Sequence, residues 1–211
     1  NAELARLARS FPAGMKADLT EKVRFNASAF YYDYQNYQAY SFDRFATFLF
    51  NADAKSKGAE FELQANPIKG LDIVLGLALL DAEVTNVPST ISATGKETPA
   101  LSPKASFNGL VRYEWPAFGG SLSVQADYGW QDDQNFNLIY TPVVHEDAYG
   151  IANARIGYTS GDDKWSASVW VKNLTDQEYR SYAFDTTAFF GSIENVPGLK
   201  RWFGGSITYR W

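Results

Sequence analysis

Residues 121–131 read SLSVQADYGWQ and alternate between two kinds of side chain. Leu122, Val124, Ala126, Tyr128 and Trp130 are apolar or aromatic, whereas the residues between them are polar or glycine. Successive side chains of a β-strand point to opposite faces, so this period of two predicts a strand with one apolar and one polar face. The strand is longer than the about 5–6 residues typical of soluble sheets.

The same alternation recurs around residues 59–66, 105–115, 165–171 and 203–211. The whole pattern predicts nine antiparallel strands, near 12–20, 22–38, 45–66, 70–86, 102–116, 120–136, 149–160, 163–174 and 200–211. Short turns are predicted at 20–22, 66–70, 116–120 and 160–163. Longer loops are predicted at 39–44, 87–101, 137–148 and 175–199. Short turns at one end and long loops at the other are typical of an outer-membrane β-barrel.

The composition is compatible with such a barrel. The longest apolar run, residues 73–80, is far shorter than the roughly 18 residues that a transmembrane helix needs. A barrel strand crosses the membrane with only about 9–11 residues and alternates apolar with polar side chains. A mean hydropathy of −0.29 therefore does not separate a barrel from a soluble domain.

The main structural alternative is a soluble β-sandwich with one wet face per sheet. The apolar faces carry no Lys or Arg, which would cost about 2–4 kcal/mol each in the middle of a bilayer. Aromatic residues gather near the strand ends, as in the interfacial girdles of barrels: Tyr31, Tyr32, Tyr34, Tyr128, Trp130, Tyr158, Trp165, Tyr209 and Trp211. Strand length, loop alternation and ring placement favour the barrel.

Several function classes find no support in the sequence. A net charge of −5 without a basic patch argues against nucleic-acid binding. The chain has no Cys and a single His, His145, so no metal site and no cofactor are predicted. No nucleophile elbow, zinc-protease motif or nucleotide-binding glycine loop is present, and we predict that the protein is not an enzyme.

A family resemblance rests on five motifs in order. Residues 51–63, NADAKSKGAEFEL, resemble the "N…S-x-G-x-E-x-E" strand of TonB-dependent receptors, and residues 70–83 are similar to the strand that follows in that family. Pro99, Pro103 and Lys104 resemble the entry to a later strand. Residues 171–179, VKNLTDQEY, resemble its "v-x-N-L-x-D-x-x-Y" segment. Residues 197–201, PGLKR, resemble its terminal "P-G-x-P-R", with Lys200 in place of Pro.

The resemblance spans about Gly14 to Trp211 and implies an all-β, antiparallel transmembrane barrel of 22 strands, of which these would be the last nine. Residues 1–211 would then be the C-terminal part of the barrel domain, without the family's plug domain and TonB box. An odd strand count agrees, since a complete bacterial barrel has an even number. Residues 2–9 contain good helix formers, but we expect them to be part of an extracellular loop.

The resemblance also implies a function: a receptor in the outer membrane of a Gram-negative bacterium that imports a scarce ligand, expected to be a ferric siderophore, with energy from the TonB complex. The rings and the histidine of the loops are the candidate ligand contacts, although they could instead pack the loops together: Tyr140, His145, Tyr182, Phe184, Phe189 and Phe190. The terminal strand resembles the signal read by the barrel-assembly machinery, carried by Phe203, Ile207, Tyr209 and Trp211.

Two other functions stay open at this point. A passive porin or a small self-contained barrel could close with eight or ten strands. A soluble binding module would stay monomeric without detergent, whereas exposed apolar bands would make a barrel wall aggregate. Among the motif residues, Asn173 is predicted to bind backbone at a strand end. Glu60 and Glu62 share one face, which we interpret as a hydrated lumen face rather than an acid–base pair or cation site.

Overall fold

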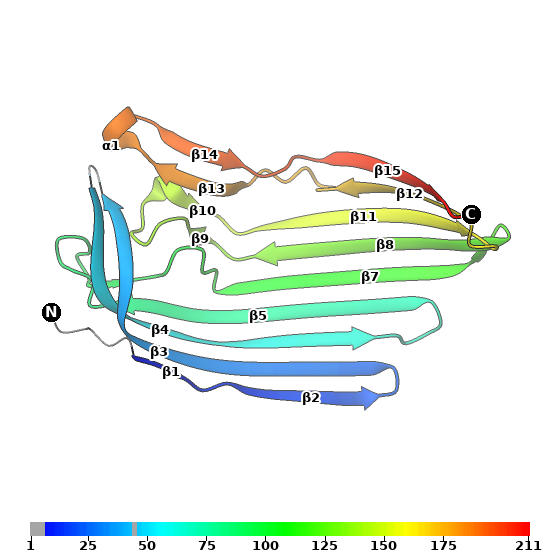
Figure 1. The fold of residues 1–211 in the computed structure, drawn as a ribbon, viewed down its shortest axis with the longest axis horizontal. Coiled ribbons are helices and arrows are strands. Elements are labelled where there is room, and N and C mark those ends of the chain that lie inside the picture. The colour runs from blue at the N-terminus through cyan, green and yellow to red at the C-terminus, as the bar shows by residue number, and fades with distance from the viewer. Residues whose placement is uncertain (1–6, 44–45) are drawn as a thin grey trace.

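The computed structural model describes residues 7–43 and 46–211, most of which form one twisted antiparallel meander, with two small two-stranded sheets, β9–β10 and β13–β14, in the loops (Figure 1). Nine long strands follow one another in sequence and in space among the described residues. They are β2 (Ala13–Thr20), β3 (Val23–Asp43), β4 (Ala46–Ala65), β5 (Leu71–Thr85), β7 (Ala105–Ala117), β8 (Gly120–Gln131), β11 (Tyr149–Ser160), β12 (Trp165–Lys172) and β15 (Trp202–Tyr209). Each agrees with one predicted strand, within a few residues at most ends.

The remaining elements are short and lie mostly in the loops. β1 (Leu7–Ser10) continues the edge formed by β2, because both pair with β3. The others are β6 (Lys96–Glu97), β9 (Gln134–Asn135), the 3-10 turn η1 (Pro142–Val144), β10 (His145–Glu146), β13 (Arg180–Asp185), α1 (Thr187–Phe190) and β14 (Ile193–Pro197). No helix of the described residues is long and apolar enough to cross a membrane.

The strand register gathers the apolar side chains on one face of the sheet. One row of directly opposed residues crosses seven strands and contains no charged residue: Ala65, Ile73, Val111, Ala126, Ala154, Val171 and Phe203. The neighbouring row on the opposite face contains Asp72, Arg112, Gln125 and Arg155. A slip of one residue in any strand would exchange the two faces, so the alternation in sequence fixes the register.

The apolar face has the dimensions of a bilayer core. From Leu122 to Trp130, β8 rises about 27 Å along its own direction. At a strand tilt of about 40°, this is about 21 Å across the membrane, close to the apolar band of outer-membrane barrels. Ring pairs border the band near the short turns, where Tyr113 stacks on Trp115 at 5.2 Å and Trp165 lies 4.6 Å from Tyr209.

Turns and loops separate to the two ends of the sheet. The short turns after β2, β4, β7 and β11 lie together at the right of Figure 1, with the C-terminus, and the long connections lie at the left. Gly70 closes the turn between β4 and β5 at a φ of 83°, and a Cβ there would run into the carbonyl oxygen of Glu114. Glycine is therefore required at this position.

Two predicted boundaries are wrong. Residues 39–44 were expected in a loop, but β3 continues to Asp43 and β4 begins at Ala46. The outer parts of both strands bend across the loop end of the sheet (Figure 1), after a bulge at Asn36, whose φ is 56°. Ala39 is buried there against Val84, Val87 and Leu138, and this packing keeps the hairpin extended.

The second error concerns residues 2–9, which were expected to form an extracellular loop. Leu7–Ser10 instead form β1, paired with residues 32–35 of β3. These residues have good helix propensity, but a strand here can pair with the backbone N–H and C=O groups of β3, which a helix would leave without partners. The rest of that segment, residues 1–6, lies outside the described residues.

A charge on the apolar face tests its assignment to lipid. In the outer-membrane protein as the cell makes it, Val111→Arg should lower the free energy of unfolding by about 2–4 kcal/mol, because Val111 lies at mid-strand on the apolar face. Urea unfolding in lipid vesicles measures this change. Leu110→Arg is the matched control, since Leu110 lies on the polar face opposite Asp127. Equal losses from both variants would refute the assignment of the faces.

Candidate functional site

The long connections pack together at the loop end of the sheet. One cluster joins Ala39 and Ala52 of the bent hairpin to Val84, Val87 and Leu138. A second joins Phe136, Val144 and Ala183, and so ties β9–β10 to the β13–β14 hairpin. We call these packed connections the loop plate, comprising residues 34–43, 46–54, 84–101, 134–146 and 180–197. It positions side chains from distant parts of the sequence beside the loop end of the curved wall, which we call the mouth.

Arg180 holds the second half of the loop plate together. Its Nε donates to Glu146 Oε2 at 2.6 Å, and its backbone N–H donates to Glu146 Oε1 at 2.9 Å. The guanidinium also donates to the carbonyl oxygens of Val143 and His145, and it lies 6.0 Å from the ring centre of Phe136. The Glu146 side chain is only 11% exposed, so this pair is shielded from water and can fix loop geometry.

The structure brings two predicted site residues together. Tyr140 packs edge-on against His145, with ring centres 5.5 Å apart, and remains half exposed. His145 Nδ1 lies 2.9 Å from Asn135 Oδ1 across the β9–β10 ladder. Its Nε2 lies 3.8 Å from Asp133 and 3.7 Å from Asp147. The described residues nevertheless contain no group of three side chains placed to hold a metal ion.

The other predicted residues belong to the β13–β14 hairpin and do not gather at one point. Tyr182 packs against Phe136 at 5.6 Å, so its ring helps to join the loops. Phe184 is partly buried, and Phe190 is largely exposed at the end of α1. The side chain of Phe189 lies outside the described part of the chain. Contact with ligand therefore remains a prediction for all six residues, and packing accounts for the rings of Tyr140 and Tyr182.

The connection between β13 and α1 is held by a carboxylate. Asp185 Oδ1 accepts hydrogen bonds from the hydroxyl of Thr187 at 2.6 Å and from its backbone N–H at 2.9 Å. The hydroxyl bond, and then the backbone bond, lower the pKa of Asp185 below its ordinary value. The resulting stabilisation is present above the ordinary pKa and is lost as the pH falls through the lowered one.

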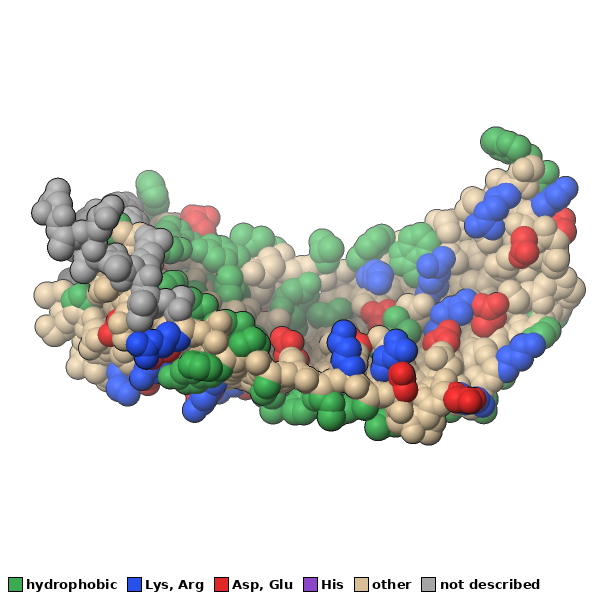
Figure 2. Space-filling model, turned by 60° about the horizontal axis from the view of Figure 1, so that its bottom comes forward, with side chains coloured by type: hydrophobic (Ala, Val, Ile, Leu, Met, Phe, Trp, Pro, Cys, Tyr) green, Lys and Arg blue, Asp and Glu red, His purple; other side chains and the backbone are tan. Residues whose placement is uncertain are grey.

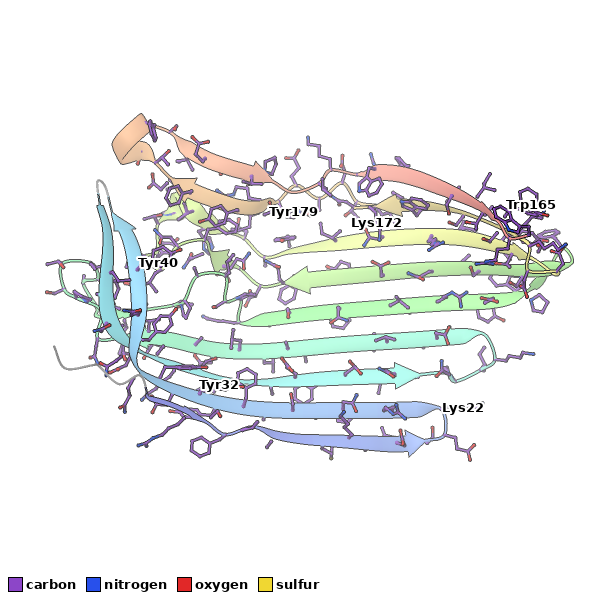
Figure 3. The ribbon with its side chains drawn as sticks, viewed as in Figure 1. Lys22, Tyr32, Tyr40, Trp165, Lys172 and Tyr179 are labelled. Carbon is purple, nitrogen blue, oxygen red and sulfur yellow. The ribbon has the colours of Figure 1, made fainter. Side chains whose placement is uncertain are left out.

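An aromatic ladder at the mouth was not among the predicted site residues. Phe30, Tyr32 and Tyr34 follow one another on the polar face of β3, with ring centres 5.4 and 6.0 Å apart. Figure 3 labels Tyr32 on β3 and Tyr40 on the bent part of the hairpin. The partner residues on β4 are Gly58, Ser56 and Ala54, all small. The alternation of β3 contained this signal, but Tyr32 and Tyr34 were interpreted only as part of an interfacial girdle, and Phe30 was not singled out.

Below the ladder, the polar face carries a pair of carboxylates. Ser28 Oγ donates to Glu60 at 3.3 Å, and Asn26 Nδ2 and Gln64 Nε2 donate to Glu62 at 3.0 and 2.7 Å. A cleft of about 690 Å³ lies over these residues. Figure 2 shows charged side chains of both signs along the hollowed wall. Lys16 lines the same cleft, but neither carboxylate forms an ion pair within the described residues, which agrees with a hydrated lumen face.

The segment after β12 anchors the loop plate to the wall. Asn173 is 3% exposed and has a φ of 52°. Its Nδ2 donates to the carbonyl oxygens of Gln177 and Leu199, at 2.9 and 3.0 Å, and its Oδ1 accepts from the Gln177 N–H at 2.8 Å. Asp176 accepts from the N–H of Arg201 at 2.7 Å. The predicted backbone-binding role of Asn173 is confirmed.

The geometry defines the class of protein. The sheet is a curved antiparallel meander that has a lipid-facing band, a polar inner face and loops packed at one end. These are the features of a piece of transmembrane β-barrel wall. The family model for the TonB-dependent receptor-like β-barrel matches residues 7–174. The chain therefore belongs to the TonB-dependent receptor family, whose members are transport receptors of the Gram-negative outer membrane. The predicted family, fold class and localisation are confirmed.

Solved structures share the fold at low sequence identity. The ferric yersiniabactin uptake receptor FyuA from Yersinia pestis matches with a TM-score of 0.77 and 18% identity, over 95% of this chain and 29% of its own. BauA, the ferric preacinetobactin receptor from Acinetobacter baumannii, gives 0.74 and 17%, over 96% and 29%. The copper transporter OprC gives 0.72 and 18%, over 96% and 30%. The chain thus spans under a third of the length of these proteins.

The anchor at Asn173 is open to a direct test. Asn173→Asp replaces two N–H donors by an acceptor that faces the carbonyl oxygens of Gln177 and Leu199, and should cost about 2–3 kcal/mol in the free energy of unfolding. Urea unfolding of the membrane-inserted protein gives the value. Asn51→Asp is the control, because the Asn51 side chain is exposed on β4 and forms no side-chain hydrogen bond among the described residues. A loss no larger than the control's would contradict the anchoring role.

The Arg180–Glu146 pair predicts coupled loop dynamics. Glu146→Gln should speed amide hydrogen exchange in β13 and β14 by about tenfold or more, because it weakens the charge-assisted bonds that hold Arg180. Mass spectrometry of the exchanged protein measures the rates. Glu178→Gln removes a carboxylate from the exposed pair with Lys200 and should leave them unchanged. If both variants behave alike, the pair does not hold the loop plate.

Proposed function

We propose that this chain serves an outer-membrane receptor that imports a scarce ligand, expected to be a ferric siderophore, with energy supplied by the TonB complex. The observation that carries the proposal is the placement of an aromatic ladder and a braced loop plate directly above a polar inner face. Such a mouth offers flat rings for stacking and hydrogen-bonding groups below them, which is the arrangement of a small-molecule site. Residues 1–211 would contribute the C-terminal part of its barrel domain.

The ligand class needs evidence beyond the fold. FyuA and BauA are receptors for ferric siderophores, whereas OprC is a copper transporter, and all three have similar folds. The aromatic side chains favour a ligand with planar rings, which many iron chelators possess. Phe30, Tyr32 and Tyr34 join the six predicted loop residues as candidate contacts, with Tyr140 beside His145 the best placed among the six.

Energy coupling separates this proposal from a passive pore. Cells lacking the gene should lose growth and radioactive iron uptake on one ferric siderophore among a defined panel, and loss of TonB function should abolish the same uptake. A passive pore predicts uptake that is unchanged without TonB. Restoration by the intact gene is the control. Normal growth of the deletion strain on every iron source would remove the siderophore assignment.

The ladder gives a residue-level prediction. Tyr32→Leu should raise the ligand concentration at half-maximal uptake about 3–10-fold, because one stacking ring is lost. Tyr40→Leu is the matched control. Tyr40 lies on the same strand and is 64% exposed, and its side chain is on the opposite face of the strand from Ala39, which packs in the hydrophobic cluster of the loop plate. Concentration-dependent uptake in whole cells supplies the measurement. Equal shifts in both variants would show that the ladder makes no specific contact.

The last strand supports a further partner, the barrel-assembly machinery. Phe203, Ile207 and Tyr209 lie on the apolar face of β15, which is an edge of the described sheet, and Trp211 follows it fully exposed. An edge strand with free backbone groups and a row of exposed apolar side chains is a surface that another protein can pair with. We assign the recognition signal to these four residues.

A further inference from the structure

The turn between β7 and β8 has a backbone conformation that its first residue does not favour. Ala117 and Gly120 pair with each other at the ends of the two strands, so Phe118 and Gly119 alone form the turn. Their φ angles are 52° and 75°, and two positive values are the mark of a type I′ hairpin turn. Asn, Asp or Gly is preferred at the first position, because a bulky side chain strains the backbone there.

Packing does not explain the aromatic ring at this position. The Phe118 side chain is 88% exposed, so the described residues leave the ring in the open. A Cβ on Gly119 would likewise meet no atom within 4 Å, so the tip of the turn is free of contacts on both sides. A strained backbone that carries an exposed apolar ring indicates a contact outside the described residues.

The turn is fixed at the border of the apolar face. Tyr158 lies on that face opposite Leu122, and a Cβ on Gly120 would come 2.8 Å from its hydroxyl oxygen. The Tyr158 hydroxyl donates to the carbonyl oxygen of Phe118 at 2.9 Å. Trp115 is the residue of β7 opposite Leu122, and it belongs to one of the ring pairs that border the apolar band. The turn therefore continues the lipid-facing side of the wall.

Two neighbouring turns at the same end of the sheet also carry exposed apolar side chains. Leu19 is 60% exposed just before the turn between β2 and β3, and Ile68 is 56% exposed in the turn between β4 and β5. Lys22 Nζ donates to the carbonyl oxygen of Pro67 at 3.1 Å and so ties these two turns together. We call these three side chains, Leu19, Ile68 and Phe118, the turn row.

The turn row lies at the depth of the lipid headgroups. Phe118 comes three residues after Trp115, which is about 7–10 Å along the strand. At a strand tilt of about 40°, this is about 5–8 Å across the membrane, beyond the end of the apolar band. The polar layer on each side of the hydrocarbon core is also about 5–8 Å thick.

We propose that the turn row is a membrane anchor, in which Phe118 inserts among the phospholipid headgroups of the leaflet beside the short turns. Phe and Leu are side chains with which proteins enter the boundary between headgroups and acyl chains. Removal of the ring from water then offsets the strain of the turn, and the insertion fixes how deep the wall sits in the bilayer. Phospholipid is the partner because the lipid-facing side of the sheet runs on to this turn without interruption.

A substitution that suits the turn gives a test by sign. In the complete protein, folded in phosphatidylethanolamine–phosphatidylglycerol vesicles, Phe118→Asn should lower the urea midpoint of unfolding by about 0.5 M, because the inserted ring is lost. The turn alone predicts a higher midpoint, since Asn is preferred there. Phe118→Trp keeps a ring and should leave the midpoint unchanged. Asp163→Asn is the matched control, because Asp163 has a φ of 58° in an adjacent short turn and is already polar.

A spin label locates the side chain directly. In the same vesicles, a nitroxide attached to Phe118→Cys should collide more often with oxygen, which concentrates in lipid, than with a water-soluble nickel chelate. The same label on Asn51→Cys, at the loop end of the sheet, should show the opposite preference. Any other cysteine of the protein is first replaced by serine.

The proposal fails if Phe118→Asn leaves the midpoint unchanged or raises it. It also fails if the label at position 118 meets the chelate more often than oxygen, because the ring then lies in water. A label shielded from both reagents would mean that another protein segment covers the turn. Neither measurement involves the imported ligand or TonB, so the outcome is independent of the proposed import function.

Discussion

A chain that crosses lipid must satisfy every backbone N–H and C=O group within the protein, because the hydrocarbon offers no partner. The meander meets this demand by pairing each strand with its neighbours over the apolar band, and the other features follow from that pairing. The register sends apolar side chains to one face and polar ones to the other. The charged side chains of Arg155, Glu60 and Glu62 therefore lie on the hydrated inner face, where they avoid the free-energy cost of burying a charge in lipid.

Most of the fold could be predicted from the sequence, because alternation with a period of two indicates both where a strand lies and which residues are on each of its two faces. All nine long strands were found, and Gly70 marked a turn that only glycine can make. The errors arose where contacts between residues distant in sequence, rather than the local sequence, determine the secondary structure. Residues 39–44 were predicted as a loop, but Leu138 and Val87 pack on Ala39 and bury it in the extended hairpin. Residues 2–9 were predicted as an extracellular loop, but Leu7–Ser10 pair with the edge of β3.

The candidate site was less predictable, because loop residues carry no period. His145 and Tyr140 were predicted as candidate ligand contacts in one loop, but their contact with each other depends on the β9–β10 ladder, which sequence alone does not reveal. Arg180 and Glu146, which brace the loops, lie 34 positions apart and gave no motif. The Phe30–Tyr32–Tyr34 ladder was visible in sequence, yet its place on the inner face required the register with Gly58 and Ser56.

The anchor at Asn173 joins two parts of the molecule that have different surroundings. The wall must match the lipid with its apolar face, whereas the loop plate lies at the loop end of the sheet, beyond the apolar band. Because Asn173 binds backbone carbonyl oxygens rather than particular side chains, the loop beyond it can exchange its residues without disturbing the attachment. The joint therefore lets the sequence of the loop plate change while the register and the apolar face of the wall stay the same.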